Sequence, residues 1–151
     1  MRAFPLLCCL VVSACATVHQ PEIDDLKPAV DAFHKSVRWK DFRTAAELVV
    51  PERRDSFLKA RAKLHDERDL FISDFTLDDA RLSKTGNTAT AVSHVSWYRL
   101  PSNSERTETV TSVFVWRNDV WLLESQLDGP FDDLKPAPEK VPAPPPGARL
   151  P

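Results

Sequence analysis

Cysteine is scarce in this chain of 151 residues and stands only near its beginning, at Cys8, Cys9 and Cys15. The rest of the chain therefore has no thiol for disulfides, metal binding or nucleophilic catalysis. Glycine is equally rare, with three residues in all, and no glycine-rich loop that could hold a phosphate is present. The sequence thus excludes disulfide-bonded domains, thiol enzymes and P-loop nucleotide-binding proteins.

Long apolar runs and an excess of basic residues are also missing. No segment after residue 15 approaches the roughly 20 apolar residues that a helix needs to span a bilayer. The chain has 20 Lys and Arg residues against 22 Asp and Glu, so it has no positive surplus to neutralise the phosphates of a nucleic acid. Nucleic acid is therefore not an expected partner.

The first 15 residues follow the pattern of a bacterial export signal. Arg2 supplies a positive start, residues 4–12 are an apolar stretch of signal-peptide length, and Val12-Ser13-Ala14-Cys15 resembles the lipobox of bacterial lipoproteins. The resemblance implies that residues 1–14 are cleaved, that Cys15 carries acyl chains, and that residues 15–23 form a lipidated tether. The alternative is an ordinary secretory signal in which Cys15 is incidental. Ala16, where an aspartate would resemble an inner-membrane retention signal, favours the outer membrane of the cell envelope, on its periplasmic side.

Apolar residues at helical spacing predict three helices after the tether. The first begins between residues 24 and 27 and ends before Trp39, and Asp41 is a plausible N-cap for a short second helix. A third helix begins near Pro51 and buries Phe57. Its other face is rich in charge, and we expect that face to be solvated, together with His34 and His65. The charged residues are Arg53, Arg54, Lys59, Arg61, Lys63, Asp66 and Glu67.

After residue 70 the pattern changes to that of β-strands. Four strands are predicted, over residues 71–82, 88–100, 106–117 and 120–127, with Asn118-Asp119 as a two-residue hairpin loop. Helices followed by an antiparallel meander indicate an α+β domain with the helices on one face of the sheet.

One family resembles this arrangement. Trp39-Lys40-Asp41-Phe42, Ala45-Ala46, Pro51 and the closing Asn118-Asp119-Val120-Trp121 are similar to the nuclear transport factor two-like superfamily, over residues 24–128. The resemblance implies a cone-shaped roll in which a curved four-stranded sheet wraps the helices around a pocket, here over residues 24–134. The superfamily includes ketosteroid isomerase, polyketide cyclases, dehydratases and catalytically silent binding modules.

The hairpin predicts which residues line that pocket. A two-residue loop pairs Trp116 with Trp121 and Phe114 with Leu123, and would also pair Ser112 with Ser125. A turn centred on Ser102-Asn103 would bring Ala89 opposite Trp116 and continue the same face into the second strand, unless a β-bulge shifts the register. The predicted pocket-lining residues are Phe33, Ala91, Ser93, Val95, Ser112, Phe114, Trp116, Trp121, Leu123 and Ser125.

This face is apolar, with serines as its main polar groups and with no inward carboxylate or imidazole from strands two to four. The acid and tyrosine groups of ketosteroid isomerase find no counterpart there, because His94 and Tyr98 are predicted to point outward. We therefore expect a non-catalytic binding module with no cofactor and no metal site. The alternative is an envelope hydrolase or isomerase that brings His94 and an acid such as Asp74 or Asp79 into the pocket. A titratable cluster buried at the mouth or floor of the cone would contradict the non-catalytic prediction.

Beyond residue 134 the chain is rich in proline, with seven prolines in residues 135–151. Such a segment favours extended polyproline II conformation, and it is either a spacer or a docking strip. The expected partners are the membrane, through the lipid, and an unidentified envelope protein or a small apolar ligand. Apolar residues on the outer face of the second strand, Val92 and Leu100, also suggest a homodimer.

Overall fold

The computed structural model describes residues 22–136. The predicted signal peptide, Cys15, most of the tether and nearly all of the proline-rich segment lie outside the described residues. The elements follow in the order α1 (Ile23–Arg38), α2 (Phe42–Glu47), α3 (Pro51–Lys63), α4 (Asp66–Asp69), β1 (Leu70–Leu82), β2 (Thr88–Arg99), β3 (Arg106–Arg117), β4 (Val120–Leu127) and the 3-10 turn η1 (Asp132–Leu134). None of the helices in residues 22–136 is long and apolar enough to cross a membrane.

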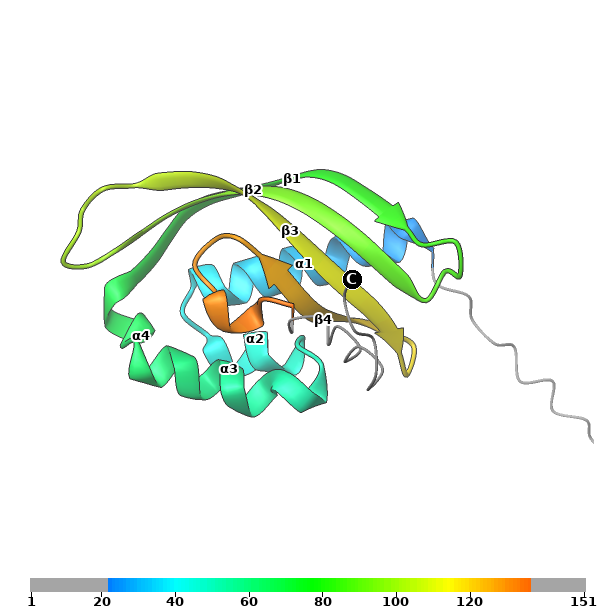
Figure 1. The fold of residues 1–151 in the computed structure, drawn as a ribbon, viewed down its shortest axis with the longest axis horizontal. Helices are drawn as coiled ribbons and strands as arrows, with labels where there is room; N and C mark the ends of the chain where they lie inside the picture. Colours follow the sequence, from blue (N-terminus) through cyan, green and yellow to red (C-terminus); the bar gives the residue numbers. More distant parts are fainter. Residues whose placement is uncertain (1–21, 137–151) are drawn as a thin grey trace, which may run out of the picture.

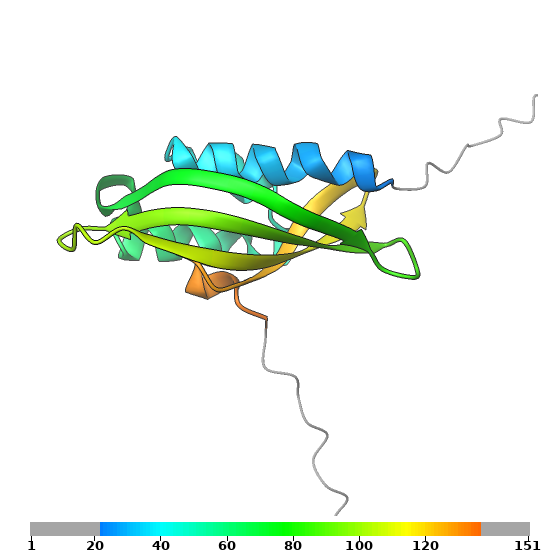
Figure 2. The same cartoon turned by 90° about the horizontal axis from the view of Figure 1, so that it is seen from above.

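The four strands form one antiparallel sheet in the order β1-β2-β3-β4. The sheet is curved, α1 lies across it, and α2 and α3 form the opposite wall (Figure 1). Seen from above, α1 runs along β1, and η1 lies near the opposite edge of the sheet (Figure 2). The predicted α+β class, with helices packed on a curved four-stranded sheet, is therefore confirmed.

The long helix α1 packs into the core through one apolar face. Leu26, Val30, Phe33 and Val37 recur every three or four residues and are all buried. A capping box between Glu22 and Asp25 closes the amino-terminal end, so the helix starts at Ile23, slightly before the predicted range. At the other end, Asp41 caps α2 by accepting a hydrogen bond from the Thr44 amide at 3.1 Å, as predicted.

The hairpin between β3 and β4 has the predicted two-residue loop. Asn118 and Asp119 both have positive φ, 52° and 60°, which is the backbone that a type I′ turn requires. Trp116 pairs with Trp121 and Phe114 with Leu123, as expected.

Further along that hairpin the predicted register is wrong. A shift between Phe114 and Val113 places Ser112 opposite Gln126 rather than Ser125, because a bulge adds one residue to β4. Gln126 consequently takes the inward place, where its amide nitrogen donates to the Ser112 hydroxyl at 3.1 Å. Ser125 instead pairs with Val113.

The pairing of β2 with β3 differs from the prediction by two residues. Ala89 lies opposite Phe114 rather than Trp116, and Ala91 opposite Ser112. The reason is the loop, because the hairpin is centred between Pro101 and Ser102 instead of between Ser102 and Asn103. A shift of two residues keeps every side chain on the same face. The residues predicted for the inner face of β2 therefore still lie on that face.

Candidate functional site

The residues predicted to line a pocket lie on the inner side of the sheet and on α1, except Ser125, which the bulge in β4 pairs with Val113 on the other face; the inner ones are packed between the sheet and the helices. Nearly all of them are buried, and Phe33, Ala91 and Leu123 are fully so; Trp116, at the β3 end, is half-buried. The cavities described below are lined by other residues. The inner face is thus part of the hydrophobic core.

Phenylalanine side chains fill the space between the sheet and the helices. The Phe131 ring, from the segment after β4, lies 5.9 Å from the Phe33 ring and 5.8 Å from the Phe57 ring, centroid to centroid. Phe131 and Leu134 are both buried. We call residues 129–134 the plug, because they insert two apolar side chains into the cone.

Backbone carbonyls of the plug and of its flanks are held by arginines. The Arg53 guanidinium donates hydrogen bonds of 2.7–3.1 Å to the carbonyl oxygens of Glu124, Asp133, Leu134 and Lys135. Arg99 donates to the Pro130 carbonyl at 3.3 Å. At the start of the plug, Gly129 has a φ of +78°, and a Cβ there would lie 2.8 Å from a Val110 methyl group. Glycine is therefore required at that turn.

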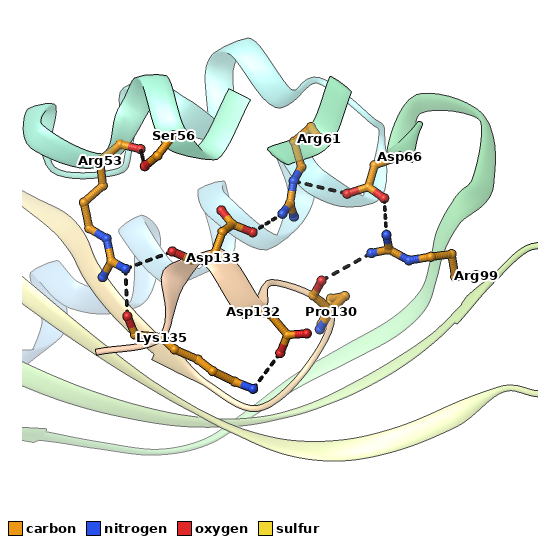
Figure 3. Close-up of polar contacts among 9 residues, drawn as sticks. All are labelled: Arg53, Ser56, Arg61, Asp66, Arg99, Pro130, Asp132, Asp133 and Lys135. Atoms are coloured by element: carbon orange, nitrogen blue, oxygen red, sulfur yellow. Dashed lines mark hydrogen bonds and ion pairs between the residues drawn. The ribbon is translucent and has the colours of Figure 1, made fainter. Parts of the chain in front are cut away.

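Beside the plug lies an ionic cluster of two buried residues, Arg61 and Asp66, and two partly buried ones, Asp133 and Arg99 (Figure 3). Arg61 Nε is 3.1 Å from Asp66 Oδ2, Arg99 Nη1 is 2.7 Å from Asp66 Oδ1, and Arg61 Nη2 pairs with Asp133. The Arg61 side chain is 2% exposed and that of Asp66 is 0% exposed. The Arg61 guanidinium also lies 4.8 Å from the Phe57 ring centroid and 4.5 Å from that of Phe131.

Burial perturbs the ionisation of this cluster. Desolvation raises the pKa of the Asp66 and Asp133 carboxyls, although the Arg61 charge opposes the rise. Desolvation likewise lowers the pKa of Arg61, against the attraction of the two carboxylates. Carboxyls with a raised pKa beside a cavity are candidates for function as well as for structure.

Two sequence predictions fail at this cluster. Arg61 and Asp66 were expected on a solvated face and are buried instead, because Asp66 at the start of α4 pairs with Arg61 and the plug brings Asp133 to the same guanidinium. The cluster is a group of titratable side chains of the kind that an enzyme would need, but its members pair with one another beside the plug and do not surround an open interior. No local pattern could reveal it, since 72 positions along the chain separate Arg61 from Asp133.

Two histidines behave differently from one another. His34, expected at the surface, is 3% exposed and stacks on the Phe75 ring at 4.2 Å. Burial lowers the pKa of His34 to about 4, so the ring is neutral at neutral pH. His65 is exposed, as predicted.

His94 points outward, as predicted, on the face of the sheet away from the helices. Its Nε2 lies 2.8 Å from Asp78 Oδ2, and its Nδ1 lies 3.2 Å from the Thr109 hydroxyl. The partner acid is Asp78, not Asp74 or Asp79. Because the imidazole is half exposed and lines none of the cavities described here, this orientation favours a binding module over an enzyme with His94 in its pocket.

Two cavities flank the ionic cluster. The larger, of about 670 Å³, lies between α2, α3 and α4 and has Arg61 in its wall. The other, of about 460 Å³, lies between α3 and the plug and includes Arg99 and Asp133. Within residues 22–136, no group of three or more His, Cys, Asp or Glu side chains is arranged to hold a metal ion.

Solved structures of low sequence identity share this architecture. An NTF2-like protein of unknown function from Shewanella oneidensis MR-1 has 12% identity, a TM-score of 0.55, and matches 68% of this chain and 94% of its own. A proposed dehydratase of the NTF2-like family from Streptomyces avermitilis has 23% identity, a TM-score of 0.51, and coverages of 69% and 92%. This chain has an NTF2-like fold. The SEC-C motif protein RPA3114 from Rhodopseudomonas palustris is also similar, with 16% identity, a TM-score of 0.51, and coverages of 71% and 91%. No protein-family model and no curated protein sequence matches the chain.

Proposed function

We propose that this chain is a lipid-anchored protein of the bacterial cell envelope whose NTF2-like domain binds a partner or ligand and catalyses no reaction. Cys15 carries the acyl chains, and the domain faces the periplasm from the outer membrane. Several acyl chains anchor firmly, because each buried methylene contributes about 0.8 kcal/mol and a single chain is marginal.

The filled cone is the observation that carries the binding proposal. An enzyme of this fold needs an open interior in which acid and base groups reach a substrate. Here Phe131 and Leu134 occupy that interior together with Phe33 and Phe57. Binding then takes place on the outer surface of the domain.

One observation favours an enzyme as the second candidate. The Asp133 carboxyl lines the cavity between α3 and the plug, and burial raises its pKa. A carboxyl of this kind, next to Arg99, is able to exchange a proton with a bound molecule.

Metabolic labelling with an alkyne analogue of palmitate tests the anchor. We expect the wild-type protein to be labelled and the Cys15→Ala variant to lose the label and leave the membrane fraction. Cys8→Ala is the matched control, since it removes a cysteine that the cleaved signal peptide carries, and it should be labelled normally. Equal labelling of wild type and Cys15→Ala would refute the anchor.

Complementation of a deletion strain separates the two candidate functions. Asp133→Asn keeps the size of the side chain and an acceptor for Arg61 but removes the titratable group. The binding module predicts that this variant restores the wild-type phenotype as well as its neighbour Asp132→Asn does. Loss of complementation by a folded, membrane-bound Asp133→Asn protein would favour the enzyme.

A further inference from the structure

The cavity between α2, α3 and α4 is separate from the cone interior. Its wall comes from the turn after α1, from α2, from α3 and from the residues around α4, and no strand residue takes part. Its volume of about 670 Å³ is within the range of small-molecule sites. The helix α4, which contributes part of this wall, lies with the β2–β3 hairpin at the end of the domain opposite the amino-terminal end of α1 (Figure 1).

The wall of this cavity carries more positive than negative side chains. Four of its residues are Lys or Arg, against two that are acidic, Asp41 and Glu67. Asp41 is already engaged, because its carboxylate accepts hydrogen bonds from the amide and the hydroxyl of Thr44. Arg61 and Arg68 are likewise paired, with Asp66 and Asp133 and with Asp69, so the attraction of the cavity for an anionic occupant comes mainly from Lys40 and Arg43.

Arg61 gives this charge a fixed position at the back of the cavity. Its guanidinium is held by Asp66 through Nε and by Asp133 through Nη2. Its third nitrogen, Nη1, is buried and has no hydrogen-bond partner among the described residues. Because Nη1 has almost no accessible surface, an occupant of the cavity meets the Arg61 charge through its electric field and not through a hydrogen bond to this nitrogen.

Apolar side chains form the rest of the wall. Phe42 and Leu58 line the cavity next to the charged groups. Trp39, which directly precedes the lining residue Lys40 in the chain, is 76% exposed. Exposed apolar side chains beside a cavity are typical of binding sites for molecules with an apolar part.

We infer that this cavity binds an amphiphilic molecule that joins an anionic head, carboxylate or phosphate, to an apolar body. The head lies near Lys40 and Arg43, in the wall that they share with Arg61, and the body covers Phe42 and Leu58. This inference rests on the proposed binding function and names the surface that performs it.

Titration of isotope-labelled residues 16–151 with four probes tests the inference by amide chemical shifts. The probes are octanoate, octyl phosphate, octylammonium and inorganic phosphate. We expect octanoate and octyl phosphate to shift residues of α2 and α3 saturably, with a Kd of about 1 mM or below, and the tighter of the two identifies the head group. Octylammonium and inorganic phosphate should bind at least about tenfold more weakly.

Two charge-reversal variants, one in the wall of this cavity and one outside it, provide a matched comparison. Arg43 is exposed, so Arg43→Glu should leave the fold intact and raise the Kd for the anionic probes by about tenfold or more. Lys59→Glu makes the same change on the exposed surface of α3, outside the cavity, and should alter the Kd less than about twofold.

Three results would overturn the inference. They are the absence of saturable binding by either anionic probe, equal binding of octylammonium, and equal effects of the two charge reversals. Shifts confined to another part of the outer surface would refute this cavity as the site and leave the proposed binding function standing, whereas shifts confined to the cone interior, around Phe33 and Phe114, would contradict both. A wild-type protein that takes up no palmitate label would refute the anchor without touching the cavity.

Discussion

The inner face of the sheet and the ionic cluster are both buried, yet they are built on opposite rules. On β2 and β3 the inward positions alternate with outward ones, and small Ala89 faces the bulky Phe114 across the strands. The cluster instead joins Arg61, Asp66 and Asp133 from three separate segments. The stability of the inner face depends on the packing of its side chains and should not change with pH. The stability of the cluster depends on charge balance, because the removal of one partner leaves an opposite charge without its counterion.

The largest loss should follow from opening the apolar region. Phe114→Ala removes a fully buried ring and should lower the free energy of unfolding by about 4 kcal/mol, independently of pH. Denaturant unfolding at pH 5 and pH 7 measures this. Thr109→Ala, on the exposed face of the same strand, should change stability by less than about 0.5 kcal/mol. A similar loss in both variants would show that the inner face is not packed.

Breaking the charged region should cost slightly less and should depend on pH. Arg61→Met leaves the Asp133 carboxylate without its ion-pair partner and Asp66 with Arg99 alone, and should cost about 3 kcal/mol at pH 7. The pKa of both carboxyls, already raised by burial, then rises further. The penalty of the substitution is therefore present at neutral pH and diminishes as the pH falls toward the ordinary aspartate pKa.

The matched control for that variant is Lys59→Met, which removes an exposed cation from the same helix. It should be close to neutral at both pH values. An Arg61→Met penalty that stays constant from pH 7 to pH 4 would mean that the cluster contributes packing alone.

His34 should give the whole domain a pH dependence of its own. Its folded-state pKa of about 4 lies below the ordinary histidine value, so the unfolded chain binds the extra proton first. The contribution of the neutral His34 to the free energy of unfolding is fully present above about pH 6.5. It decreases by about 2–3 kcal/mol as the pH drops to 4. His34→Phe should flatten this part of the profile. A profile unaffected by His34→Phe would exclude a buried neutral imidazole.

The smallest expected effect belongs to a purely local contact. Asp41→Ala removes the α2 cap, in which the Asp41 carboxylate accepts from the Thr44 amide, and should cost about 1 kcal/mol. Asp41→Asn should recover most of that loss. Thermal unfolding of the two variants, measured side by side, would contradict the capping role if they behaved alike.

These regions also differ in how far the sequence predicts them. Period-two alternation along β2 and β3 identifies the inner face correctly, even though the registers are wrong by one residue at Ser112 and by two at Ala89. Alternation carries no information about a bulge or about the centre of a loop. The cap at Asp41 and the hairpin at Asn118-Asp119 are predicted in full, because the physics that determines them spans only a few residues.

The sequence predicts the plug and the ionic cluster less well than it predicts the inner face of the sheet. Inward serines and rings predict an apolar interior but not that Phe131 fills it, since the plug comes from an acidic loop with turn residues. His34 sits among charged neighbours, and its burial follows from the position of Phe75 on β1. Arg61 and Asp66 look like surface charges on a helix until the plug brings Asp133 to them.

Hydrogen exchange of the plug amides tests most directly the claim that the cone is filled. The Leu134 amide donates to the Phe131 carbonyl at 2.9 Å, and the Gly129 amide donates to the Glu108 carboxylate at 3.0 Å. If the plug is a permanent part of the core, the Leu134 amide exchanges only through global unfolding, with protection close to that of the central strand amides. Fast exchange of Leu134 while β2 and β3 stay protected would show that the plug opens and exposes the interior, and would contradict the account.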